Sequence, residues 1–225
     1  MREAERRIPV RPEAESLSRG TVATRTKASD LRRHDLMDAG ERTFVQKGFT
    51  STTIEDITHK AGVAKGTFYL YFDSKEALLT ALRDRFIEGC RERIEVLAAR
   101  LPAADWAGRL DAWVEGGIRH YLDHVKLHDV LFHDGQQSHG SKAQNAAVLE
   151  LEELIRAGSA ARAWHVESSE LVSVFLFRAL HGIADHILSN RRSDHEAAIR
   201  LSQRIVRNTI GLPPEAGSRP TLSRS

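Results

Sequence analysis

A short segment of the chain, residues 65–75, combines the side chains that proteins use to bind phosphate. Lys65 supplies a positive charge, Thr67 and Tyr69 supply hydroxyl groups, and Gly66 allows another backbone to approach closely. DNA presents a dense row of phosphates to such donors, and base edges in its major groove accept the same hydrogen bonds. The segment predicts contact with a nucleic acid, although residue types alone favour an ordinary protein surface.

A second set of polar side chains lies on apolar segments in the middle of the chain. His124 and His128 are four residues apart, and Arg178, His181 and Asp185 form the polar strip of an otherwise apolar segment at 168–189. Polar strips that face an apolar interior are what a small-molecule cavity needs. The predicted ligand cavity is lined by Trp113, Tyr121, His124, His128, Phe175, Arg178, His181 and Asp185. Hydrogen-bonded core histidines with an internal ion pair fit the pattern equally well.

His124 and His128, with either His181 or Asp185, also have the residue types and spacing of a Zn²⁺ or Ni²⁺ site. One such pair is weak evidence in a chain with 11 histidines, so the sequence leaves a metal site open and predicts no cofactor. His-Glu-x-x-His, a nucleophile elbow and a phosphate loop are all missing from the sequence. The chain is therefore predicted not to be an enzyme, with a metal-dependent hydrolase as the weaker alternative.

The composition predicts a cytoplasmic protein. Apolar residues make up 41% and charged residues 28% of the chain, which is typical of soluble globular proteins. Cys90 is the single cysteine, which excludes an intrachain disulfide and fits a reducing cytosol. No apolar run approaches the roughly 20 residues of a membrane span, and the N-terminus lacks the apolar core of a signal peptide. No membrane partner is expected.

The polar side chains must be positioned by helices, because almost every segment between the chain ends has helical period and none alternates as a strand does. The predicted helices span residues 30–47, 53–60, 64–71, 74–100, 105–125, 127–133, 142–158, 168–189 and 195–210. The predicted fold class is all-α, with about nine helices. Residues 1–27 and 212–225 are predicted to be disordered tails around a small domain at 28–73 and a larger one at 74–211.

Basic charge gathers just before the first predicted helix, although the net charge of the chain is only +2. Residues 19–33 hold Arg19, Arg25, Lys27, Arg32 and Arg33 against Asp30. Arg25 and Lys27 could form an arm that follows a DNA backbone or enters a minor groove. A plain solvated tail is nearly as compatible with this segment.

Two short helical segments flank Gly62. The stretch TTIE at 52–55 is typical of a capping box, with Thr52 at the N-cap and Glu55 reaching back to its amide, and Asp73 or Ser74 caps the next helix. Helices of fewer than about 12 residues are marginal alone, so both must pack on the helix at 30–47. A helix, a glycine turn and a second short helix form a helix-turn-helix, whose second helix enters the DNA major groove.

The segment TIEDITHKAGVAKGTFYLYFDSKEALL resembles the DNA-binding signature of the tetracycline-repressor (TetR) family of transcriptional regulators. The matching positions are Thr53, Ile57, Ala61, Gly62, Val63, Gly66, Tyr69, Tyr71, Phe72, Lys75 and Leu78. The close match covers about 50 residues, from Leu31 to Leu82, and the rest matches only in layout. Ala64 departs from the family, which often has serine there and gains a cap and a phosphate contact from it.

The resemblance implies an N-terminal three-helix DNA-binding domain and a C-terminal helical ligand-binding and dimerisation domain. The implied function is a homodimeric regulator, most often a repressor, that binds an inverted-repeat DNA operator and is released by a small-molecule effector. In the family, the positions of Tyr69 and Lys75 usually touch the DNA backbone. The predicted DNA-binding residues are Arg25, Lys27, Thr52, Thr53, Ala64, Lys65, Gly66, Thr67, Tyr69, Tyr71 and Lys75. A constitutive architectural DNA-binding protein without an effector is the alternative.

The last predicted helix carries two apolar stripes. Ala198, Leu201 and Ile205 form one, and Ile199, Val206 and Ile210 form the other. One stripe can face the protein's own core and the other a partner, and the preceding long helix is apolar almost all round. The second stripe is assigned to the partner, so the predicted dimer interface is Leu176, Leu180, Ile183, Ile187, Ile199, Val206 and Ile210.

Overall fold

The computed structural model describes residues 16–132, 142–189 and 194–212, with side chains from Asp30 in the first range and from Ala146 in the second. These ranges contain nine helices and no strand, so the predicted all-α class is confirmed. The helices are α1 (Ser16–Lys47), α2 (Ile54–Ala61), α3 (Lys65–Tyr69), α4 (Lys75–Ala98), α5 (Trp106–Asp123), α6 (Val125–Phe132), α7 (Lys142–Ala160), α8 (Ser169–Ser189) and α9 (His195–Thr209). Their ends agree with the predicted ones to within two residues, except at the start of α1.

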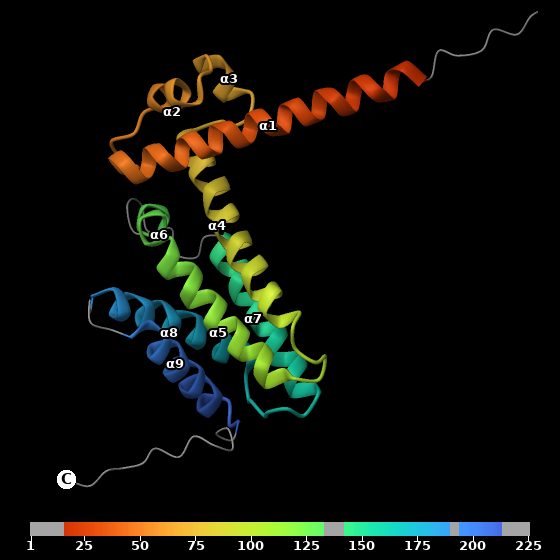
Figure 1. Cartoon of the computed structure of the whole chain (residues 1–225), viewed down its shortest axis with the longest axis vertical. Helices are drawn as coiled ribbons and strands as arrows, with labels where there is room; N and C mark the ends of the chain where they lie inside the picture. Colours follow the sequence, from red (N-terminus) through yellow and green to blue (C-terminus); the bar gives the residue numbers. More distant parts are fainter. Residues whose placement is uncertain (1–15, 133–141, 190–193, 213–225) are drawn as a thin grey trace, which may run out of the picture.

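The helix α1 begins at Ser16, so the predicted tail at 1–27 is wrong for residues 16–27. No proline interrupts residues 16–47, and a helix that is already nucleated extends at little further cost. Figure 1 shows this N-terminal part of α1 extending beyond the rest of the protein. Residues 1–15 and 213–225 of the two predicted tails lie outside the described residues.

The first three helices form a small domain around one hydrophobic core. In Figure 1, α2 and α3 lie together on one side of α1, and α4 runs from α1 toward the other helices. The core is made of Leu36, Met37, Ala39, Phe44, Ile57, Phe68, Phe72, Leu78, Leu79, Leu82, Phe86 and Leu131. Four of these residues belong to α4 and one to α6, so the core continues past the predicted domain boundary at residue 73. Short α2 and α3 are therefore held by tertiary packing.

A second hydrophobic core lies between α5, α7, α8 and α9. α5 contacts α4, α8 and α9, and α7 packs along α8. α8 is long and apolar enough, by length and composition, to cross a membrane, whereas the sequence predicted no such run. It packs on α5, α7 and α9 and buries Ser173, Leu176, Phe177, Leu180, Ala184 and Ile187. α8 therefore packs with one face against the core of the larger domain.

The short helix α6 connects the two cores. It follows α5 in the chain but contacts α1 and α4 as well as α5. Leu131 is buried in the core of the small domain, and its carbonyl oxygen accepts a 2.6 Å hydrogen bond from Arg83 Nε on α4. His128, one turn earlier, is buried against the larger domain and lines a cavity there. A displacement at either end of α6 therefore reaches the other domain.

Candidate nucleic-acid interface and ligand cavity

The helix α2 begins one residue later than predicted. Thr53 is its N-cap, and its hydroxyl accepts a 3.1 Å hydrogen bond from the Asp56 amide while the Asp56 carboxylate accepts one from the Thr53 amide. The predicted capping pair of Thr52 and Glu55 is therefore wrong. Thr52 is buried, and its hydroxyl donates to the Gly48 carbonyl at 2.7 Å. This leaves Thr53 exposed on the surface and removes Thr52 as a direct DNA contact, because its hydroxyl is already used inside the fold.

The helix α3 presents a small polar face to solvent. Phe68 is buried in the core, whereas Lys65, Gly66 and Tyr69 are exposed and Thr67 is half-buried. Tyr71, just after α3, is half-buried and packs against the small-domain core. Ala64, the exposed N-cap, makes no side-chain hydrogen bond to the helix, so the first amides of α3 lack the cap that a serine would give them.

Lys65 is held by an acidic neighbour in the absence of DNA. Its ammonium donates to the carboxylate of Glu55 on α2, and both side chains are more than half exposed. This contact raises the pKa of Lys65 and lowers that of Glu55. An exposed ion pair of this kind contributes little stability, so Lys65 can exchange Glu55 for a phosphate or a base edge at small cost.

The Lys75 ammonium forms hydrogen bonds within the chain, whereas the family resemblance implies a phosphate contact. Its ammonium donates to the carbonyl oxygens of Phe49 (2.8 Å) and Thr52 (2.7 Å), with a longer contact of 3.5 Å to Thr50. It also lies 4.4 Å from the centre of the Phe49 ring. Lys75 thus fixes the loop that leads into α2. Thr53 and Lys75 line the same open groove as Lys65, Tyr69 and Ser74, the N-cap of α4.

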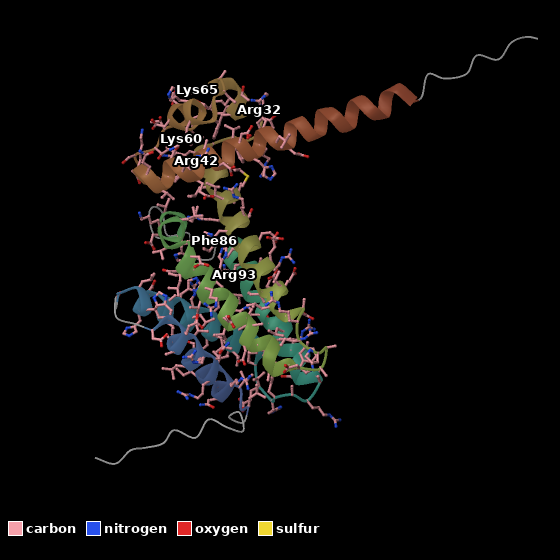
Figure 2. The ribbon with its side chains drawn as sticks, viewed as in Figure 1. Arg32, Arg42, Lys60, Lys65, Phe86 and Arg93 are labelled. Atoms are coloured by element: carbon pink, nitrogen blue, oxygen red, sulfur yellow. The ribbon has the colours of Figure 1, made fainter. Side chains whose placement is uncertain are left out.

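Further basic residues of the small domain lie on α1 and α2. Figure 2 shows Arg32, Lys60 and Lys65 on the unit formed by α1, α2 and α3, away from α8 and α9. Lys60 donates to Gln46 at 3.1 Å, and Lys47 pairs with Asp56 at 2.6 Å, so both link α2 to α1. Arg25 and Lys27, the predicted DNA-binding arm, lie in the helical N-terminal part of α1, and their side chains are outside the described set.

A cavity of about 80 Å³ lies in the larger domain between α4, α5, α6, α7 and α8. A single water needs about 10–15 Å³ by the same measure, so the space exceeds that of several waters. The residues that line it are Phe86, Ile87, Cys90, Arg91, Ile94, Trp113, Gly117, Ile118, His120, Tyr121, His128, Ala147, Glu150, Phe177, Leu180, His181 and Ala184. Most of this lining is apolar or aromatic, which is typical of small-molecule sites.

The structure brings half of the predicted cavity residues together. Trp113, Tyr121, His128 and His181 line the cavity. Asp185 lies behind Tyr121 and accepts a 2.5 Å hydrogen bond from its hydroxyl. His124, Phe175 and Arg178 are exposed residues outside the lining, so their assignment is wrong. On α8, Phe175 and Arg178 are exposed whereas Phe177 is buried. A helix with apolar residues on all sides gives no pattern from which this difference could be predicted.

The sequence interpretation missed the contribution of α4 and of His120. Phe86, Ile87, Cys90, Arg91 and Ile94 recur on one face of α4, and this apolar spacing was a usable signal. His120 is 7% exposed and its ring centre lies 4.5 Å from that of Phe86. Burial, with positive charge at His124 and Arg93, lowers the pKa of His120 to about 4. Its ring is therefore neutral at physiological pH.

The histidines do not form a metal site in the described part of the chain, where no three His, Cys, Asp or Glu side chains converge. His124 is exposed and its Nδ1 donates to the His120 carbonyl at 2.9 Å. His128 is buried between Tyr121 and Phe132, with ring centres 3.9 and 4.9 Å away. The rings pack as part of an aromatic cluster at one end of the cavity.

One apolar face of α8 and α9 is exposed, and it is the face opposite to the predicted dimer interface. Leu176, Leu180, Ile187, Ile199, Val206 and Ile210 are buried in the chain's own core, and Ile183 is half-buried. The exposed apolar residues on these helices are Leu171, Val174, Phe175, Leu201 and Ile205. The predicted assignment of the two stripes is therefore reversed, because both are apolar and polar contacts decide which one faces inward.

These polar contacts join α9 to α5. Arg207 Nε donates to both carboxylate oxygens of Asp111, at 2.9 and 3.0 Å. Arg119 pairs with Glu196 at 2.7 Å. Between α8 and α9 the exposed side forms a groove whose lining includes the small residues Ala179 and Gly182. Small residues on a helix face allow a second helix to approach closely.

The small domain matches a known protein family closely, whereas similarity over more of the chain is weaker. Residues 36–82 match the model of the family described as bacterial regulatory proteins, tetR family. The chain is 28% identical over 161 residues to the HTH-type transcriptional regulator EthR of Mycobacterium tuberculosis, covering 72% of this chain and 62% of that protein. It is 50% identical over 46 residues to the uncharacterized HTH-type transcriptional regulator YerO of Bacillus subtilis, covering 20% of this chain and 16% of that one. The chain thus spans less than two thirds of either relative.

The fold extends the similarity to both domains. The transcriptional regulator FadR of Bacillus subtilis, solved in complex with stearoyl-CoA, superposes with a TM-score of 0.65 at 18% sequence identity, over 80% of this chain and 99% of that chain. At this identity the likeness concerns the arrangement of helices alone.

Proposed function

We propose that this chain, which belongs to the tetR family of bacterial regulatory proteins, binds an inverted-repeat DNA operator as a homodimer and releases it when a small molecule occupies the cavity of the larger domain. The observation that carries the proposal is the surface of the small domain. Lys65, Gly66 and Tyr69 are exposed on α3, and Thr53 and the start of α4 border the same groove. Hydroxyl groups, amides and the cations Lys65 and Lys75 thus lie where the second helix of a helix-turn-helix meets DNA.

Within this surface the residues have separate roles. Lys65 and Thr67 face base edges, and Thr53 and Tyr69 contact phosphates beside them. Ala64 and Gly66 let the backbone of α3 approach the DNA closely, and Tyr71 supports α3 from the core side. Lys75 holds the loop before α2 and adds positive charge behind the phosphates. Arg25 and Lys27, on the extending part of α1, follow the DNA backbone outside the groove.

The exposed face of α8 and α9 is the dimer interface of this proposal. Its apolar residues, Leu171, Val174, Phe175, Leu201 and Ile205, would otherwise remain in water. Two copies related by a two-fold axis bury the same patch twice and form a four-helix arrangement. Identical α3 helices then read identical half-sites, which requires an inverted repeat.

Ligand release in this proposal runs through α4 and α6. Phe86 of α4 lines the cavity and also belongs to the small-domain core. α6 likewise contributes His128 to the cavity and Leu131 to the small-domain core. A ligand that fits one tilt of α4 better than another shifts the separation of the two small domains. Differential affinities of this kind typically amount to about 1–3 kcal/mol. The similarly folded FadR was solved in complex with stearoyl-CoA, which supports a small-molecule ligand for a chain of this fold.

The test is selection of DNA sites from a random pool by the full chain, followed by fluorescence anisotropy on the selected site. We expect an inverted repeat, a mass of two chains on the DNA, and a log-linear loss of affinity with salt. Lys65→Ala should abolish preference for the selected site over random DNA, while the matched change Lys126→Ala, at an exposed position of α6, should not. Selection of no common sequence would support an architectural DNA-binding protein instead, and a single half-site bound by a monomer would contradict the dimer.

A further inference from the structure

One end of the cavity carries a buried polar atom without a protein partner. The side chain of His120 is 7% exposed and its Nε2 is fully buried. The Phe86 backbone carbonyl interacts with the His120 ring closely enough to oppose the lowering of its pKa, but among the residues that the structure describes no group makes a hydrogen bond of normal geometry to Nε2. A buried polar atom left unpaired costs about 1–3 kcal/mol, so a ligand that pairs with it gains that interaction.

The neighbouring polar groups of the lining already have partners. The Tyr121 hydroxyl donates to Asp185 at 2.5 Å. His181 Nδ1 lies 2.8 Å from the Phe177 carbonyl, which can only accept, so this nitrogen carries the proton. Both contacts fix the orientation of their side chains. His120 Nε2 has almost no accessible area in this structure and lies beside Gly89 of α4. A ligand that turns the His120 ring or displaces α4 at Gly89 can therefore satisfy this atom without breaking a hydrogen bond of normal geometry in the fold.

The charges of the lining disfavour an ionic ligand. Arg91 is the only lysine or arginine among the described lining residues, and its guanidinium is paired with Glu88 and Glu95 on the same helix. Glu150 is the only Asp or Glu in that lining, and burial raises its pKa. The His120 ring is neutral because its pKa is lowered to about 4. An anion would find no uncompensated lysine or arginine in this described lining, and burial disfavours the ionised form of Glu150 that a cation would need as its partner.

From this geometry we infer that the cavity takes a neutral, largely aromatic or apolar ligand that carries a hydroxyl group, and that this hydroxyl pairs with His120 Nε2. A hydroxyl can donate and accept, so it fits either tautomer of a neutral imidazole. Phe86, Trp113 and Phe177 supply the apolar and aromatic contact area. The inference rests on the proposed ligand role of the cavity and corrects the expectation of an anionic end near Arg178, which lies outside the cavity.

The test uses four probes with one ring system and the full chain without DNA. They are naphthalene, 2-naphthol, 2-naphthoate and 2-naphthylmethylammonium, measured at neutral pH by quenching of tryptophan fluorescence and by calorimetry. We expect 2-naphthol to bind roughly tenfold more tightly than naphthalene, which is the worth of one well-made hydrogen bond. Both charged probes should bind more weakly than 2-naphthol. Tightest binding by either charged probe, or no binding by any, would overturn the inference.

Two substitutions assign the effect to atoms. His120→Phe should keep the binding of naphthalene and remove the tenfold advantage of 2-naphthol. Gly117→Leu should abolish binding of both, because a Cβ at Gly117 points into open space with nothing within 4 Å and the added side chain fills the cavity. An advantage of 2-naphthol that survives in His120→Phe would refute the role of His120.

A second measurement covers the case in which His120→Phe does not fold. In the unaltered chain, the ring ¹⁵N signals of His120 should shift on adding 2-naphthol and stay in place with naphthalene, and equal shifts would count against the hydrogen bond. These readouts contain no DNA. Failure of operator selection would therefore leave them intact, and failure of the probes would leave operator binding intact, so the two proposals can fail separately.

Discussion

Acid should destabilise the fold through His120, and the size of the effect follows from its burial. The pKa of His120 is lowered from 6.5 to about 4 because burial disfavours the imidazolium, and His124 and Arg93 add nearby positive charge. The unfolded chain therefore binds a proton at this position at higher pH than the folded chain does. The contribution is fully present above about pH 6.5 and is lost progressively as pH falls toward 4.

The loss in the free energy of unfolding is set by the difference between the two pKa values of His120. This difference is about 2.5 pH units, and each unit corresponds to about 1.4 kcal/mol. The folded state should therefore lose roughly 3 kcal/mol of stability by pH 4 through this one group. A loss of this size is a large fraction of the stability of an ordinary domain, which is about 5–15 kcal/mol.

The assay is urea unfolding of the full chain between about pH 7.5 and 4.5, followed by circular dichroism. His120→Phe removes the titrating group, so its free energy of unfolding should fall less steeply with acid than that of the unaltered chain. Comparing slopes cancels any constant cost of the substitution itself. The control His165→Gln changes an exposed ring and should follow the unaltered chain. Parallel profiles for the unaltered chain and His120→Phe would refute the reasoning.

Two matched pairs of substitutions and one single substitution test the packing that positions the sites. Gly116→Ala should destabilise the chain by about 1–3 kcal/mol in urea unfolding, because its Cβ would lie 2.6 Å from Ile94 Cγ1. Gly117→Ala should be neutral or stabilising by up to about 1 kcal/mol. Equal costs of the two substitutions would contradict the placement of the cavity. Ile205→Glu should convert dimer to monomer in light scattering without unfolding it, while Val206→Glu should unfold the chain, since Val206 is buried; an unchanged mass for Ile205→Glu would remove this face as the interface. Lys75→Met keeps the apolar stem and should cost about 1–2 kcal/mol in urea unfolding, because the carbonyls of its loop lose their donor; unchanged stability with weaker DNA binding would return Lys75 to a purely phosphate-binding role.

Much of the fold could be predicted from local patterns. Helical period and breakers such as Gly62 and Pro102 located the helices, because propensity and chain breaks are properties of short segments. The start of α2 was misplaced by one residue because Thr52 and Thr53 are both good caps. Only the tertiary contact of the Thr52 hydroxyl with Gly48 decides between them.

Local patterns could not predict which face of a helix points into the core. α9 has two apolar stripes, and the pairing of Arg207 with Asp111 on α5 selects the one that faces inward. Those two residues are 96 positions apart, so no local pattern contains the information. The same holds for Phe175 and Arg178, which period alone placed near the cavity but which α8 turns toward solvent.

The position of Phe86 gives the proposed ligand response a physical route from the cavity to the small domain. Its ring packs against His120 and His128, with centres 4.5 and 5.7 Å away, and against Phe132 at 5.6 Å. The same side chain is 8% exposed and closes the core of the small domain. A ligand that contacts His120 must therefore fit beside Phe86, and any shift of Phe86 moves α4 relative to α1 or opens the small-domain core. Since packed cores resist opening, tilting of α4 as a unit is the less costly response. In the proposed dimer, contact at the His120 end of the cavity would thus couple most directly to the separation of the two small domains.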